Sequence, residues 1–246
     1  MRAGFAWLIA RRELAALARA PSSWIALALA SPAAGVAFLS SQRSLRARPA
    51  WMVLEDLFAL SAALAALAGL LLGARALVDE RLSGSWVALA AAPVSDIETI
   101  AGKWFAATAA ATATAMACSA PWLALVAADA GSTSASAAHS MGALVGIALG
   151  AGTSAAIGLA AGALVRAPAA VLASAGCVSL ALLLAGRVSR SVAAPAEHAV
   201  GWLSAELHAL AFAQGEPGVS DVAYFFGLSY MALTASVVGL RRSRWG

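Results

Sequence analysis

The residues of this chain whose types could do chemistry gather in one charged segment, residues 77–104, which lies between two long uncharged segments. We expect no catalytic site in this segment. Nucleophilic catalysis requires a base beside the nucleophile, and a nucleotide site requires a glycine-rich phosphate-binding loop. The charged and polar side chains of the segment can form ion pairs and hydrogen bonds with a partner. We therefore predict a docking loop in which these residues take part: Glu80, Arg81, Gly84, Ser85, Trp86, Pro93, Ser95, Asp96 and Glu98.

The docking loop has the pattern of two helices joined by a turn. Residues 84–91 can form a short helix, and Pro93 ends it because proline has no backbone N–H for the helical ladder. A second helix can begin after Ser95, whose hydroxyl can cap the first turn while Glu98 reaches back. Asp96 and Glu98 also suit the positive end of the helix dipole. The pattern predicts a helix-turn-helix elbow, which we place at residues 77–103.

Several kinds of chemistry are missing from the sequence. No G-x-x-x-x-G-K-[ST] loop occurs, so we expect this chain to bind no nucleotide or other cofactor and to have no enzymatic activity of its own. His198, Glu206 and His208 fall in one outer loop, where we expect surface residues rather than metal ligands. The predicted membrane spans contain no Asp, Glu, Lys, Arg or His, the residues that pumps and ion-coupled carriers usually need for a proton or cation relay. The driving force of any transport would then come from another subunit.

The composition predicts an all-α integral membrane protein. Hydrophobic residues make up 62% of the 246 residues and charged residues only 11%, and the mean hydropathy is +0.84. The sequence contains long uncharged runs that can cross a hydrocarbon core of about 30 Å. Their length indicates transmembrane helices, because the strands of a membrane barrel are much shorter. We predict six transmembrane helices in a single domain over residues 1–246, at residues 24–40, 57–74, 104–128, 141–165, 167–186 and 222–240.

The basic residues predict which side of the membrane the termini occupy. With both termini in the cytosol, eleven of the sixteen lysines and arginines lie in cytosolic segments and five in outer loops. This asymmetry follows the positive-inside rule, although Arg43, Arg46 and Arg48 in the first outer loop depart from it. The net charge of +4 then reflects membrane orientation, and we expect no nucleic acid partner.

An amphipathic helix is expected before the first span, within residues 1–22. Trp7, Ala10 and Leu14 fall on one face, and the charged residues Arg11, Arg12 and Glu13 lie near its middle. Such a helix can lie at the inner leaflet with its basic side chains near anionic lipid head groups. A solvated cytosolic extension is the alternative. We favour the interfacial helix because a turn sequence directly precedes the span.

Small residues recur every four positions in the fourth predicted span. They form the series Gly142, Gly146, Gly150, Ser154, Gly158 and Gly162. A stripe of small side chains lets the backbone of another helix come close, so we expect a helix-packing face. A substrate path along the stripe is the weaker alternative.

The elbow and both ends of the chain resemble the ABC-2 type transporter permeases, in particular their gliding-motility-type branch. In the elbow the resemblance rests on Glu80-Arg81, Ser83-Gly84, Ala92-Pro93-Val94-Ser95-Asp96 and Gly102-Lys103. Arg12-Glu13-Leu14 resembles the entry helix of that family. The last 39 residues contribute His208, Phe212, Gly215, the segment 221–225 and the basic end 241–245. Where the family often has a threonine and an acidic residue after the elbow glycine, this chain has Ser85 and Val87.

The resemblance implies a permease subunit of an ATP-driven exporter in the bacterial cytoplasmic (inner) membrane. Its partners would be two copies of an ABC ATP-binding subunit, which bind ATP and magnesium, a second permease that is identical or homologous, and membrane lipids. The outer loop 187–221 would contain a short amphipathic helix near the exit. Two other classes stay open: a non-transporting membrane scaffold, and a channel or ion-coupled carrier.

Overall fold

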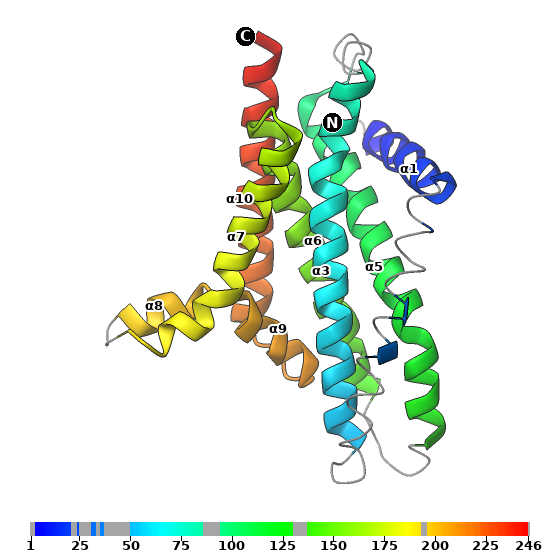
Figure 1. The fold of residues 1–246 in the computed structure, drawn as a ribbon, viewed down its shortest axis with the longest axis vertical. Coiled ribbons are helices and arrows are strands. Elements are labelled where there is room, and N and C mark those ends of the chain that lie inside the picture. Colours follow the sequence, from blue (N-terminus) through cyan, green and yellow to red (C-terminus); the bar gives the residue numbers. More distant parts are fainter. Residues whose placement is uncertain are drawn as a thin grey trace.

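The computed structural model describes residues 3–20, 24, 31–32, 35–36, 50–85, 94–129, 137–192 and 196–245. In these ranges the regular structure is entirely helical. The helices are α1 (Ala3–Arg19), α3 (Ala50–Ser83), α5 (Asp96–Asp129), α6 (Ala137–Leu164), α7 (Pro168–Ser189), α8 (Ala196–Trp202), α9 (Ala205–Ala213) and α10 (Val219–Trp245). Figure 1 shows the long helices side by side, with α1 beside one end of the bundle.

Four of the described helices are long and apolar enough to cross a membrane. They cover Glu55–Ser83, Met141–Leu164, Pro168–Ser189 and Val219–Arg242. The prediction of an all-α protein with several long apolar helices is confirmed at this level. Of the other two predicted spans, residues 24–40 lie mostly outside the described residues, and the side chains of α5 are described only as far as Ala120.

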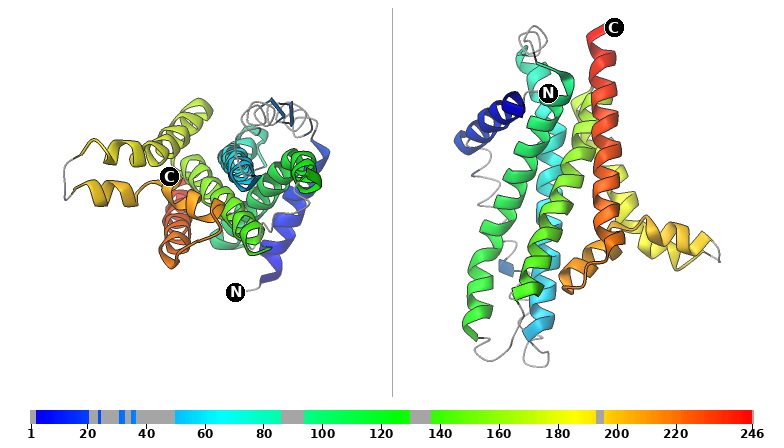
Figure 2. Two further views of the ribbon diagram at one scale, coloured as in Figure 1. Left: turned by 90° about the horizontal axis from the view of Figure 1, so that it is seen from below. Right: turned by 180° about the vertical axis from the view of Figure 1, so that it is seen from behind.

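The central helix of the bundle is α6, which packs against α3, α5, α7 and α10. Many of its buried side chains are small, among them Ala151 and Ala155, both fully inaccessible to solvent. Small side chains leave room for close helix contacts, which replace the hydrophobic driving force that is absent between helices in lipid. Figure 2, seen from below, shows the other long helices grouped around α6.

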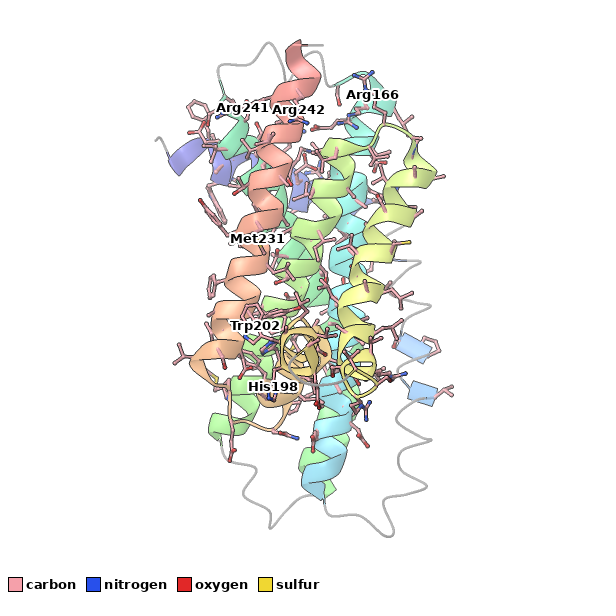
Figure 3. The ribbon with its side chains drawn as sticks, turned by 90° about the vertical axis from the view of Figure 1, so that its left-hand side faces the viewer. Arg166, His198, Trp202, Met231, Arg241 and Arg242 are labelled. Atoms are coloured by element: carbon pink, nitrogen blue, oxygen red, sulfur yellow. The ribbon has the colours of Figure 1, made fainter. Side chains whose placement is uncertain are left out.

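The two ends of the bundle differ. One end, here named the terminal end, carries α1, the last turn of α10 and the turn between α6 and α7 (Figure 1). Arg166, Arg241 and Arg242 lie at this end in Figure 3. Toward the other end, here named the far end, α7 leads into the short helices α8 and α9. Helix α8 carries His198 and Trp202 and projects sideways from the bundle beside α7, whereas α9 packs against α6, α7 and α3 (Figures 1 and 3).

The small-residue stripe of α6 is not one contact surface, which corrects the expectation of a single packing face. A Cβ on Gly158 would collide with the Leu70 carbonyl of α3, whereas one on Gly146 would meet Phe212 of α9. A Cβ on Gly150 would meet nothing within 4 Å. With 3.6 residues per turn, each four-residue step overshoots a full turn by about 40°, so the stripe winds around the helix.

The remaining stripe positions follow the same winding. Gly142 faces the segment after α9 at ordinary contact distance, and a Cβ on Gly162 would lie 3.1 Å from the Ala74 carbonyl oxygen of α3. Ser154 lies beside Gly150 on the wall of a cavity. The closest approach to α6 is completed from the α3 side by Gly73, whose Cβ would collide with the Ala155 backbone.

Candidate functional site

The elbow begins and ends with the local structure that its sequence predicts. Helix α3 ends at Ser83, and Gly84 follows with a φ of 72°, a left-handed conformation that suits glycine after a helix. At the start of α5 the capping box is confirmed, because the Ser95 backbone N–H donates to Glu98 Oε2 at 3.0 Å and the Glu98 N–H donates to Ser95 Oγ at 3.3 Å. Trp86, Pro93 and the helix predicted at 84–91 lie outside the described residues beyond Ser85.

A buried ion pair joins the two ends of the elbow. Lys103 of α5 is 1% exposed and Glu80 of α3 is 7% exposed, and Lys103 Nζ lies 2.8 Å from Glu80 Oε1. The lysine also donates to the Ala76 carbonyl oxygen at 3.0 Å. A charged side chain removed from water needs partners of opposite charge and hydrogen bonds to offset its lost hydration. Lys103 obtains both from the helix that leads into the elbow.

Helix α1 completes the ion-pair cluster. Glu13 Oε1 lies 3.0 Å from Lys103 Nζ and 3.0 Å from Arg12 Nη2, and Arg12 Nη2 lies 3.2 Å from Glu80 Oε1. Two cations and two anions therefore meet, and three helices contribute them. We name Arg12, Glu13, Glu80 and Lys103 the ion-pair cluster. Of the three charged residues predicted for the interfacial helix, Arg11 is exposed and takes no place in it.

The remaining oxygen of Glu80 is a further feature of the ion-pair cluster. Glu80 Oε2 is buried and has no hydrogen-bond partner among the described residues. An unsatisfied buried oxygen costs free energy, which the ion pairs of Glu80 with Lys103 and Arg12 offset.

Apolar contacts dock α1 on α5 next to these charges. A Cβ on Gly102 would collide with Ile9 and with the Ala6 carbonyl oxygen, so only glycine fits this crossing. The rings of Trp7 and Phe105 meet edge to face with centroids 6.1 Å apart. The exposed side of α1 keeps large apolar surface, since Trp7 is 57% and Leu8 is 56% exposed.

Two further contacts tie the elbow ends to the rest of the bundle. Arg81 donates to the Val165 carbonyl oxygen at 3.0 Å and to the Ala163 carbonyl oxygen at 3.4 Å, which links the end of α3 to the end of α6. Asp96 at the start of α5 lies 3.7 Å from Arg241 of α10. Both ends of the elbow are therefore held by charged contacts to other helices.

The predicted elbow residues fall into two groups. Glu80, Arg81, Ser95, Asp96 and Glu98 form the contacts described above. Gly84 and Ser85 are exposed, and the Ser85 hydroxyl lies 2.9 Å from the Ser83 hydroxyl. The exposed pair is available to a partner.

Sequence reasoning missed Lys103 as a site residue. The predicted third span begins one residue later, at residue 104, so Lys103 was placed outside the membrane segments. In the structure α5 runs continuously through it from Asp96. A single lysine between Gly102 and Trp104, at the mouth of a long apolar run, is the signal that could have identified it.

The outer histidine cluster is also different from expectation. His208 is 7% exposed and not a surface residue. Its Nδ1 lies 2.6 Å from Asp221 Oδ1 of α10, its Nε2 lies 3.0 Å from the Trp202 carbonyl oxygen, and its ring stacks on Tyr224. This burial could not be predicted from the loop sequence, because Asp221 and Tyr224, which contact His208, belong to the next helix. His198 is exposed, and no metal-binding cluster occurs within the described ranges.

Together the fold and this site define a helical protein of the multi-pass membrane class, with a charged, helix-bridging cluster at the terminal end. No protein-family model matches the chain, and no match is found among curated proteins.

Proposed function

We propose that this chain is the permease subunit of an ATP-driven ABC exporter of the ABC-2 type. It would pair with a second permease, identical or homologous, and with two copies of an ATP-binding subunit that hold ATP and magnesium. The chain itself contributes no nucleotide site and no catalysis. The terminal end and the elbow face the cytosol in this proposal, in keeping with Arg166, Arg241 and Arg242 at that end (Figure 3).

One observation carries the proposal: Glu80, four residues before Gly84 of the elbow, forms a buried ion pair with Lys103 of α5 and a second ion pair with Arg12 of α1, whose own side chain is exposed. A partner that moves the elbow would move three helices at once, because breaking a buried ion pair is far more costly than displacing an exposed one. The contacts of Arg81 and Asp96 extend this connection to α6 and α10.

The mechanism we propose is a shift between two states. The ATP-binding subunits close on ATP and grip the elbow differently in their open and closed forms. Only such a difference in contact can shift the permease between its own two conformations. The helix bundle then tilts as a rigid body within the membrane. The ion-pair cluster keeps α1, α3 and α5 together during this movement.

The experiment uses two substitutions at Gly84. Proline fixes φ near −65° and cannot adopt the left-handed conformation, so Gly84→Pro should alter the exit of α3 and reduce ATP hydrolysis by the reconstituted complex severalfold. Asparagine tolerates this conformation, so Gly84→Asn is the matched control and should keep the activity of the unaltered complex.

Equal ATP hydrolysis by both variants, each correctly inserted and bound to the ATP-binding subunit, would contradict the coupling role of the elbow. A chain that binds no ATP-binding subunit at all would favour the scaffold alternative.

A further inference from the structure

A large cavity lies in the far half of the bundle between α3, α6, α7, α9 and α10. Its volume is about 690 Å³, within the range of sites that hold small organic ligands. Its depth is apolar and is lined by side chains such as Phe58, Leu70, Ile157 and Leu183, while Gly150 leaves open space on the α6 side.

The cavity results from the way α3 and α7 separate. Near the terminal end the two helices are in contact through Ala74, Val78 and Val171. Beyond this contact α7 leans away from α3 toward α8 (Figure 1). Between the separating helices Leu67 is 56% and Leu180 is 55% exposed. Among the residues that the structure describes, the cavity is therefore closed toward the terminal end and opens sideways between α3 and α7.

Charge is confined to one end of the cavity wall. Arg187 near the end of α7 is exposed and Glu206 at the start of α9 is half-buried, and Arg187 Nε lies 3.9 Å from Glu206 Oε2. Ser179, about 12 Å deeper along α7 at 1.5 Å per residue, has a buried hydroxyl without a hydrogen-bond partner among the described residues. The cavity wall thus changes from apolar to charged toward the far end. A lipid in the same leaflet changes in that direction too, from its hydrocarbon chain to its head group.

We propose that this cavity binds a single-chain zwitterionic amphipath, with its hydrocarbon chain between α3 and α7 and its head group at Arg187 and Glu206. A hydrocarbon chain can enter from the bilayer because the opening is lateral and apolar. A head group with one phosphate and one ammonium can pair with the arginine and the carboxylate together, whereas a purely anionic head group is repelled by Glu206. That such a molecule is the transported substrate rests on the proposed function; the binding itself does not.

The test uses the full purified chain in detergent and a photoactivatable lysophosphatidylethanolamine with the reactive group in its chain. Mass spectrometry should locate the label on peptides of α3, α6 and α7 that line the cavity. Lysophosphatidylglycerol with the same chain should compete at least fivefold more weakly than unlabelled lysophosphatidylethanolamine, and Glu206→Gln should reduce that difference.

Gly150→Leu should reduce labelling at least fivefold, because Gly150 lines the cavity and a Cβ there meets no atom within 4 Å, so the leucine side chain would extend into the cavity. Gly176→Leu is the matched control, since a Cβ there also meets nothing within 4 Å and Gly176 does not line the cavity.

Three results would overturn the proposal. The first two are label spread evenly over all lipid-facing helices and unchanged labelling of Gly150→Leu. The third is a rapid disulfide between two copies of the Leu183→Cys variant, if this disulfide abolishes labelling. The last would show that a second chain covers the opening. None of these measurements involves an ATP-binding subunit, so their failure is distinguishable from failure of the proposed function. The label position in the unaltered chain decides the matter if the leucine variant does not fold.

Discussion

Lys103 and Glu80 form an ion pair of 2.8 Å although the lysine is 1% and the glutamate 7% exposed. They lie on two different helices, at the two ends of the elbow, and Arg12 and Glu13 of a third helix contact the same pair. This arrangement makes the base of the elbow a junction of three helices and not a flexible connection.

Removing the lysine should destabilise the protein strongly. Lys103→Met leaves Glu80 buried without its closest cation, and breaking a buried pair in this way costs about 3–5 kcal/mol. Unfolding of the purified protein in detergent, followed by circular dichroism, measures the loss. The double variant Lys103→Met/Glu80→Gln should recover part of it because the uncompensated charge is removed.

Arg75→Ala is the matched control for this prediction. Its pair with Asp79 is exposed on both sides, at 58% and 57%, and exposed pairs contribute about 0–1 kcal/mol. A loss at Lys103 no larger than the loss at Arg75 would show that the ion-pair cluster does not hold the three helices together.

Two glycines of the same stripe should respond differently to leucine. Gly158→Leu places its side chain against the α3 backbone at Leu70 and should sharply lower the yield of folded protein, since the two helices cannot move apart without losing their contact. Gly150→Leu faces open space and should leave the yield unchanged. Size-exclusion chromatography of the two variants compares them, and equal yields would refute the winding of the stripe.

Local sequence patterns predicted local structure well. The Ser95 and Glu98 capping box depends on residues three apart, so it follows from the chain alone. The contacts between distant residues were not predictable in this way. Lys103 meets Glu13 across 90 residues, and His208 is buried by Asp221 and Tyr224 of another helix. The winding of the glycine stripe was predictable from 3.6 residues per turn, but the neighbours of each glycine depend on how the helices pack.

The His208 and Asp221 contact should hold α9 against α10. Asp221 also accepts a hydrogen bond from the Gly218 N–H at 2.7 Å, so Asp221→Ala removes a cap and leaves a buried histidine nitrogen without its partner. We expect a loss of about 1–3 kcal/mol and faster amide hydrogen exchange in α9. Glu197→Ala, at an exposed position of α8, should change neither, and faster exchange in both variants would argue against a specific contact.

Orientation can be tested with reporter fusions. The basic residues predict that both termini lie in the cytosol, so a reporter that is active only in the periplasm should be inactive after Gly246 and active when inserted after His198. Activity after Gly246 would reverse the topology and place the ion-pair cluster on the wrong side for an ATP-binding subunit.

The most direct test of the proposed function is cross-linking from Ser85, which is exposed at the start of the elbow. Ser85→Cys, carrying a short photoactivatable cross-linker, should capture in cells a protein that mass spectrometry identifies by its G-x-x-x-x-G-K-[ST] motif, whereas Glu197→Cys at the far end should not. Capture of such an ATP-binding subunit from Ser85 alone is the predicted result. Failure to capture one from the folded, inserted protein, with that subunit present, would contradict the proposal and favour the scaffold.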